Sequence, residues 1–197
     1  QSEITDAGYW KEEGQFSSAN TGLQAMFRDR TFNLYLWGEM RTNLYGGSPF
    51  SGEASSGYEF MWNNLLSQAS PAISNYGGCY GFINQLNLMI AKAENTDVIK
   101  EAAKNNYLGS AYGMRAFIYF QLLRTYGDVI VVTDYTKGSD ISIGNMGKAA
   151  SPAAEVMAQI KKDIQASEQA YGENYKFTNG RNYWSLAATK MLKGEAY

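Results

Sequence analysis

The chain has 197 residues, which is enough for one large domain or two small ones with a substantial buried core. Its formal net charge of -2 argues against nucleic acid as the main partner, because phosphate binding needs a basic face. The chain has no histidine and one cysteine, Cys79, so it lacks the residues for Ser-His-Asp or Cys-His catalysis, the usual zinc sites and an internal disulfide. We therefore predict neither a metal nor a cofactor.

The first predicted helix covers residues 19–40, which are strongly apolar. A long loop follows at residues 41–57, RTNLYGGSPFSGEASSG, where glycine and serine are frequent. A loop of this length is uncommon without a function. Residues 58–69 are predicted to form the next helix, because their apolar residues recur at helical spacing.

Residues 69–95 contain the next predicted helix, loosened near its start by Gly77 and Gly78. Cys79 lies in this apolar stretch, and we predict that it is a small buried residue. Thr96 or Asp97 is predicted to be the N-cap of a helix that continues through Glu101 to Tyr126. Because few residues separate the two helices, we expect them to pack as an antiparallel hairpin. The first of these helices has apolar residues at spacings of four, three and one, which fits one helical face: Phe82, Leu86, Met89 and Ile90.

The helix predicted over 101–126 is apolar on two sides, which is typical of a helix buried between neighbours. Gly109 and Gly113 lie four residues apart and would let a neighbouring backbone approach closely. Arg115 lies near the boundary of the two apolar stripes. We predict that it pairs internally with a carboxylate or with helix-end carbonyls, a ligand-binding arginine being the alternative. Gly127 is predicted to end the helix.

Residues 129–133, VIVVT, are predicted to form a short extended stretch, and a loop follows. Ser151 and Pro152 open a helix to about Tyr171, with the proline in its first turn. A last helix is predicted over 183–197, and because the chain ends within it we expect residues 1–197 to be part of a longer protein. The fold class is all-α, with TPR-like helical hairpins, long connecting loops and at most a short extended segment.

The segment YLGSAYGMRAFIYFQLLRTYGDVIVVT, residues 107–133, resembles the signature of the SusD/RagB family of nutrient-binding lipoproteins from Bacteroidetes. Further segments match the family in the same order: Trp62, YGFINQLN at 80–87, SPAAEVMAQIKKDIQAS at 151–167 and GRNYWSLAATKMLKGEAY at 180–197. The chain departs from the family at Ser110, Gly113 and Ile130, where the family commonly has Glu, an aromatic residue and Pro. Because Ser110 replaces a glutamate one turn before Arg115, the carboxylate that would pair with Arg115 is not identified.

The resemblance implies that residues 1–197 are the N-terminal, TPR-like portion of a SusD-like protein. Such a protein is a surface-exposed lipoprotein of the cell outer membrane, attached by an N-terminal lipid anchor that lies outside this chain. It is not an enzyme. It binds glycans or other nutrients and delivers them to a SusC-like TonB-dependent outer-membrane transporter.

The long loop and the residue that follows it are the predicted ligand site. Guanidinium and amide groups can bind sugar hydroxyls, and aromatic rings can stack on sugar faces. Packing within the loop is the alternative role for each residue, and Trp62 is expected to anchor its helix. The predicted ligand-binding residues are Arg41, Asn43, Tyr45, Phe50 and Tyr58.

Two other functions remain open on sequence alone. A TPR-like scaffold that binds peptides or proteins would have plain repeats and grooves lined by asparagine and lysine, and the aromatic helix and the long loop argue against it. A glycoside hydrolase needs two carboxylates about 5 to 10 Å apart. Glu39, Glu53 and Glu59 are the clustered candidates, and nothing in their spacing pairs them.

Overall fold

The computed structural model describes residues 8–39, 42, 76–136 and 147–197. Within these residues the fold is all-α, with one isolated β-bridge and no β-strand. None of the helices described has the length and hydropathy needed to cross a membrane. The helices are α1 (Glu13–Trp37), α4 (Gly77–Glu94), α5 (Glu101–Tyr126), α7 (Ala153–Tyr171) and α8 (Leu186–Ala196), with a short 3-10 turn, η4 (Asn179–Arg181), before α8.

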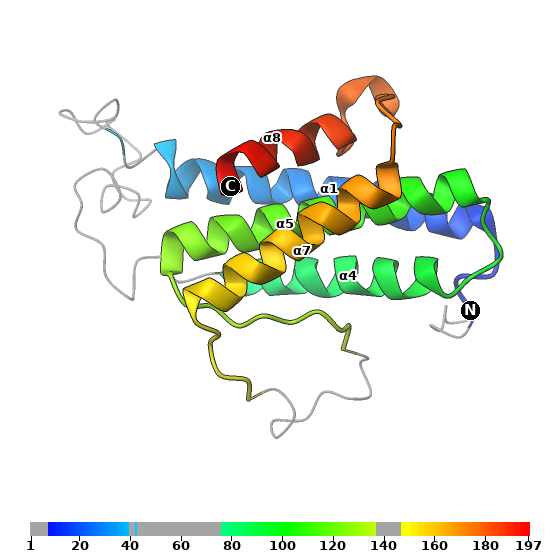
Figure 1. The fold of residues 1–197 in the computed structure, drawn as a ribbon. Coiled ribbons are helices and arrows are strands. Elements are labelled where there is room, and N and C mark those ends of the chain that lie inside the picture. The colour runs from blue at the N-terminus through cyan, green and yellow to red at the C-terminus, as the bar shows by residue number, and fades with distance from the viewer. Residues whose placement is uncertain (1–7, 40–41, 43–75, 137–146) are drawn as a thin grey trace, which may run out of the picture.

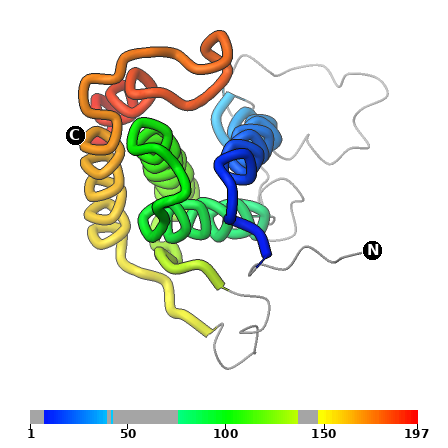
Figure 2. Tube along the Cα trace, turned by 90° about the vertical axis from the view of Figure 1, so that its right-hand side faces the viewer, coloured from blue at the N-terminus to red at the C-terminus, as the bar shows by residue number. Residues whose placement is uncertain are grey.

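Helix α5 is the centre of the structure and contacts each of the other four α-helices. It packs with α4 as an antiparallel hairpin, as predicted, and α7 and α8 form a second hairpin against its other side (Figure 1). Figure 2 shows α5 between the α7–α8 pair and α1, with α4 beside it. The arrangement confirms TPR-like helical hairpins around one shared core.

The core explains why α5 is apolar on two sides. Met114, Ile118 and Leu122 are at most 1% exposed, and Phe82 of α4 and Ile160 of α7 are completely buried. Burying side chains of this size stabilises the fold by about 1.5–3 kcal/mol each. Cys79 is 1% exposed, which confirms the prediction that it is a small buried residue.

The two glycines of α5 do allow close approach, but by aromatic rings rather than by a backbone. A Cβ atom at Gly109 would lie 2.6 Å from the ring of Tyr171, at the end of α7. A Cβ atom at Gly113 would overlap the indole of Trp184, in the turn before α8. Each glycine therefore makes room for a side chain that docks the α7–α8 hairpin.

The predicted start of the first helix is wrong. It begins at Glu13 rather than at residue 19, because the side chain of Gln15 accepts hydrogen bonds from the N–H groups of Lys11 and Glu12 and fixes an earlier start. The predicted helix over 58–69 lies outside the described residues, as does Trp62.

The end of α5 at Tyr126 matches the prediction, but its start does not. The N-cap is Lys100, because Thr96 instead accepts a hydrogen bond from Val98 within the preceding turn. Pro152 is the N-cap of α7 rather than a residue of its first turn. Helix α8 begins at Leu186 because the hydroxyl of Ser185 accepts a hydrogen bond from the helix N-terminus.

Candidate ligand-binding site

None of the residues predicted to bind ligand lies in the described part of the chain. Arg41, Asn43, Tyr45, Phe50 and Tyr58 fall in the ranges that the structure leaves undescribed, and they stay predictions. The same holds for Glu53 and Glu59, whereas Glu39 lies exposed just after α1. The described residues do form a polar hollow elsewhere, beside the segment that follows α5.

That segment, residues 129–136, begins where Gly127 ends α5. The backbone of Gly127 has a φ of 75°, which glycine adopts readily, and its N–H donates to the carbonyl of Leu123 at 2.9 Å. The chain then runs extended, as predicted. A single antiparallel bridge joins it to the segment that enters α7, through a 2.9 Å hydrogen bond from Ser151 N–H to the carbonyl of Val129.

Side chains of α4 and α5 hold this extended segment against the core. Several of them donate hydrogen bonds to its carbonyl oxygens, among them Tyr80 to Ile130 at 2.9 Å, Asn87 to Val132 and Asp134 at 3.1 Å each, and Tyr119 to Val132 at 2.9 Å. The hydroxyl of Tyr119 also accepts from the N–H of Val132 at 2.7 Å. Burial raises the pKa of Tyr119, so its phenol keeps the proton that it donates.

The Tyr119 hydroxyl should therefore matter for this segment in particular. We expect Tyr119→Phe to lower the free energy of unfolding by about 1–2 kcal/mol, because the part-buried N–H of Val132 loses its acceptor and the Val132 carbonyl keeps only its hydrogen bond from Asn87. Hydrogen exchange should show faster exchange of the Val132 amide, with little change in the middle of α4. A Val132 amide that exchanges as slowly as in the wild-type protein would contradict this role.

A buried polar cluster also holds this extended segment in place. The guanidinium of Arg115 donates to Asp163 of α7 through Nε at 2.8 Å and Nη2 at 2.7 Å, and through Nη1 to Asn87 Oδ1 at 2.7 Å and the carbonyl of Thr133 at 3.3 Å. Arg115 is 4% exposed and Asp163 1%. We call Arg115, Asp163, Asn87 and Gln159, which donates to Asp163 Oδ1 at 2.9 Å, the Arg115 cluster.

The prediction that Arg115 is an internal polar tie to a carboxylate is thus confirmed, and its partner is Asp163. Burial acts to lower the pKa of Arg115, but the hydrogen bonds and charge of Asp163 outweigh this and raise it. Burial raises the pKa of the Asp163 carboxyl, against the opposing hydrogen bonds from Arg115 and Gln159. The cluster joins α4, α5, α7 and the extended segment, so it sets where that segment lies.

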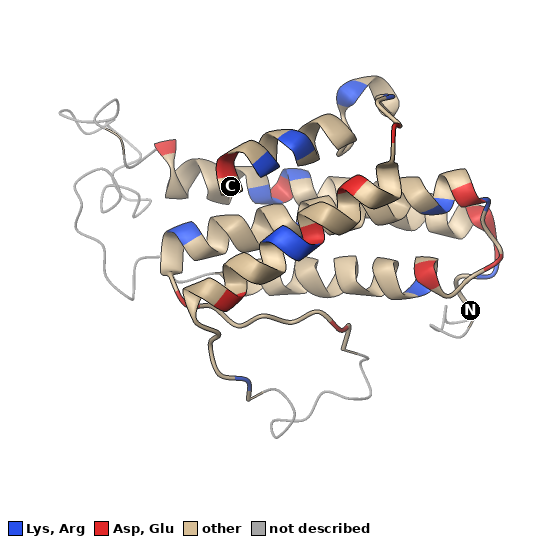
Figure 3. Cartoon of the chain, in the orientation of Figure 1, with Lys and Arg blue, Asp and Glu red and all other residues tan. Residues whose placement is uncertain are grey.

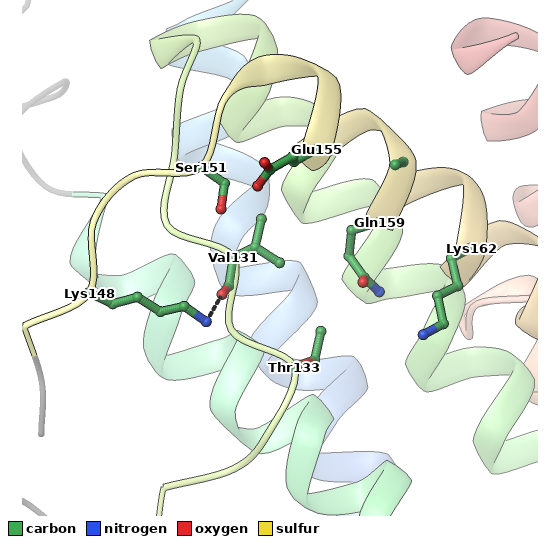
Figure 4. A pocket seen from close by; sticks show the side chains of 8 residues that line it. Val131, Thr133, Lys148, Ser151, Glu155, Gln159 and Lys162 are labelled. Carbon is green, nitrogen blue, oxygen red and sulfur yellow. Dashed lines mark hydrogen bonds between the residues drawn. The ribbon is translucent and has the colours of Figure 1, made fainter.

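Beside the extended segment lies a hollow of about 510 Å³, which we call the polar groove (Figure 4). This volume is within the range of about 300–1,000 Å³ typical of small-molecule sites. Its walls are the extended segment, the segment entering α7 and the first turns of α7. The lining residues are Val131, Thr133, Lys148, Ser151, Glu155, Ala158, Gln159 and Lys162.

The chemistry of the polar groove suits a ligand rich in hydroxyl groups. Glu155, Gln159 and Lys162 lie on successive turns of α7 along one wall, and Lys148 on the opposite wall donates to the carbonyl of Val131 at 2.6 Å (Figure 4). Ammonium and amide groups donate hydrogen bonds, while carboxylate, amide and hydroxyl oxygens accept them. Among its lining residues Glu155 is the one acid, so the groove offers no carboxylate pair.

Sequence reasoning missed the polar groove. The polar residues of α7 that line it recur at helical spacing, and such a pattern is equally typical of an ordinary solvated face. The described residues also hold no cluster of three or more Asp, Glu or Cys side chains that could bind a metal ion.

Comparison with known proteins agrees with this architecture. A SusD-like family model, described as starch-binding and associating with the outer membrane, matches residues 33–190. The SusD-like protein P38 of Formosa agariphila is 29% identical over 173 residues, which are 86% of this chain and 32% of that protein.

Two solved structures are similar in sequence and fold. NanU of B. fragilis is 54% identical with a TM-score of 0.88, and the match covers 100% of this chain and 38% of NanU. A SusD superfamily protein from Bacteroides vulgatus is 52% identical with a TM-score of 0.86, covering 95% and 37%. The chain thus spans about a third of the length of these relatives. As the sequence predicted, this chain belongs to the SusD-like family.

Proposed function

We propose that this chain is the N-terminal, TPR-like portion of a surface-exposed lipoprotein that binds glycans or other nutrients. The whole protein passes these nutrients unchanged to a SusC-like TonB-dependent transporter. A lipid anchor outside this chain attaches the protein to the outer membrane. The observation that carries the proposal is the match of residues 33–190 to a family described as starch-binding and associating with the outer membrane.

The architecture supports binding by segments that the helices hold in place. Helix α5 and the Arg115 cluster fix the extended segment that forms one wall of the polar groove. The loop predicted to carry ligand-binding residues lies between α1 and α4 in the sequence, and these two helices pack against each other and against α5.

The carboxylates of the polar groove agree with a role without catalysis, and along the described helices acidic residues are interspersed with basic ones (Figure 3). Hydrolysis of a glycosidic bond needs two carboxyl groups that flank it. In the polar groove Glu155 stands alone among the lining residues, and Asp163 behind it is fully buried and paired with Arg115. An acid held in this way is not accessible to a glycan.

The proposal is tested by affinity electrophoresis of the full-length protein against a panel of polysaccharides. We expect at least one glycan to retard the protein, and we expect Tyr45→Ala or Tyr58→Ala to abolish the retardation. The matched control is Tyr175→Ala, which removes a tyrosine that is 61% exposed in the turn after α7 and should leave the retardation unchanged.

Two results would contradict the proposal. Release of shorter sugars from any glycan of the panel would show catalysis. If no glycan retards the protein, carbohydrates are excluded as its ligands. Delivery is tested separately, by purifying the full-length protein from outer membranes with mild detergent, where we expect a TonB-dependent transporter to remain bound in stoichiometric amount.

A further inference from the structure

The extended segment has a second face, which looks away from the polar groove toward α4. Val131 and Thr133 line the polar groove, whereas Ile130 lines a separate hollow of about 200 Å³. We call this hollow the tyrosine pocket; its lining residues are Tyr76, Tyr80, Tyr126, Asp128, Val129, Ile130 and Ala150.

Three aromatic rings form one wall of the tyrosine pocket. The ring of Tyr76 packs against Tyr126, with centroids 5.0 Å apart, and against Tyr80, with centroids 5.9 Å apart. Tyr126 is in turn supported by the edge of Trp37, at 5.6 Å. Tyr76 is 41% exposed, so this ring is held in place by its neighbours and still offers surface to a ligand.

The polar groups of the pocket are also held in defined positions. The Tyr80 hydroxyl donates to the carbonyl of Ile130, and Asp128 Oδ1 accepts from the N–H of Ala153 at 2.8 Å. The second oxygen of Asp128, Oδ2, makes no hydrogen bond to any residue that the structure describes, and Asp128 is exposed. Burial raises the pKa of Tyr80 to about 12 and that of Tyr126 to about 12, so both phenols are neutral at physiological pH.

We propose that the tyrosine pocket binds one neutral pyranose ring of a glycan, with Tyr76 against a sugar face and Asp128 Oδ2 accepting hydrogen bonds from sugar hydroxyls. This inference rests on the proposed function, that the protein binds glycans. The hollow is smaller than the usual range for drug-sized ligands, so it fits a single ring rather than a chain. The one charge in the pocket is negative and disfavours an acidic sugar.

The experiment uses the full-length protein and saturation-transfer NMR, with methyl glucoside, methyl galactoside and methyl mannoside as neutral probes and methyl glucuronide as the acidic one. We expect at least one neutral probe to bind and the glucuronide to bind more weakly. Tyr76→Ala should weaken neutral binding by about five- to tenfold, as expected for the loss of an aromatic contact. Tyr76→Phe keeps the ring and should retain the affinity.

Asp128→Asn is the matched test of charge, because the amide has nearly the same shape. It should reduce the preference for neutral over acidic probes. The thermal midpoint of each variant shows whether it is folded.

The outcomes separate this inference from the proposed function. If a glycan retards the protein but Tyr76→Ala binds every neutral probe as the wild-type protein does, the tyrosine pocket is not a subsite and the proposed function stands. Equal binding of neutral and acidic probes would overturn the charge preference. If no glycan and no sugar probe binds to any variant or to the wild-type protein, the subsite is wrong and carbohydrate is excluded as the ligand of the proposed function.

Discussion

Replacing Arg115 with methionine is expected to lower the free energy of unfolding by about 3–5 kcal/mol, because the Asp163 carboxylate then stays buried without its partner. The pair lies in the core, 2.7 Å apart, with side chains only 5% and 1% exposed. Urea unfolding followed by circular dichroism measures the change. Because the cluster also holds the carbonyl of Thr133, the extended segment should lose protection from hydrogen exchange as well.

Two controls separate the loss of charge pairing from the loss of side-chain volume. The double variant Arg115→Met with Asp163→Leu removes both charges, and most of the lost stability should return. Arg124→Ala removes the arginine of an exposed pair with Glu195, whose side chains are 58% and 62% exposed, and should cost no more than about 1 kcal/mol. If Arg115→Met costs no more than Arg124→Ala, the Arg115 cluster does not hold the fold together.

The second large effect is expected at Gly113 of α5. A methyl group there would overlap the indole of Trp184, whose Nε1 donates to Thr189 Oγ1 at 2.9 Å in α8. We expect Gly113→Ala to lower the free energy of unfolding by about 1–3 kcal/mol, because overpacking a core contact forces side chains and backbone to shift. Thermal unfolding followed by tryptophan fluorescence reports both the stability and the environment of Trp184.

The matched control for this prediction is a glycine-to-alanine substitution that should raise the free energy of unfolding rather than lower it. Gly22 lies in α1 with no atom within 4 Å of an added Cβ, so Gly22→Ala should raise the stability by up to about 1 kcal/mol through helix propensity alone. If Gly113→Ala also stabilises the protein, then Trp184 can move aside and the close contact does not determine how α8 docks.

Local patterns were enough to predict most of the helical architecture. The apolar periodicity and the stop at Gly127 placed the body and the C-terminal end of α5 correctly, and Arg115 was predicted to be an internal polar tie. Where a boundary depended on a particular side-chain hydrogen bond, as at Gln15 or Thr96, the pattern gave the wrong residue. Capping contacts of this kind vary with backbone geometry that periodicity does not describe.

Contacts between distant segments could not be predicted. Asp163 lies 48 residues after its partner Arg115, and no local signal joins the two. Gly113 indicated a close approach without showing that Trp184 makes it. The polar groove forms where the extended segment, the entry to α7 and α7 itself meet, so it exists only in the folded chain. The ligand residues predicted between Arg41 and Tyr58 lie outside the described residues.

The most direct test of the account is a calorimetric titration of the full-length protein with oligosaccharides from a polysaccharide that retards it, with the sugars analysed by chromatography afterwards. Binding without catalysis predicts a saturable heat of binding and oligosaccharides of unchanged length. Heat that continues beyond saturation, together with shorter products, would contradict the central claim and identify an enzyme instead.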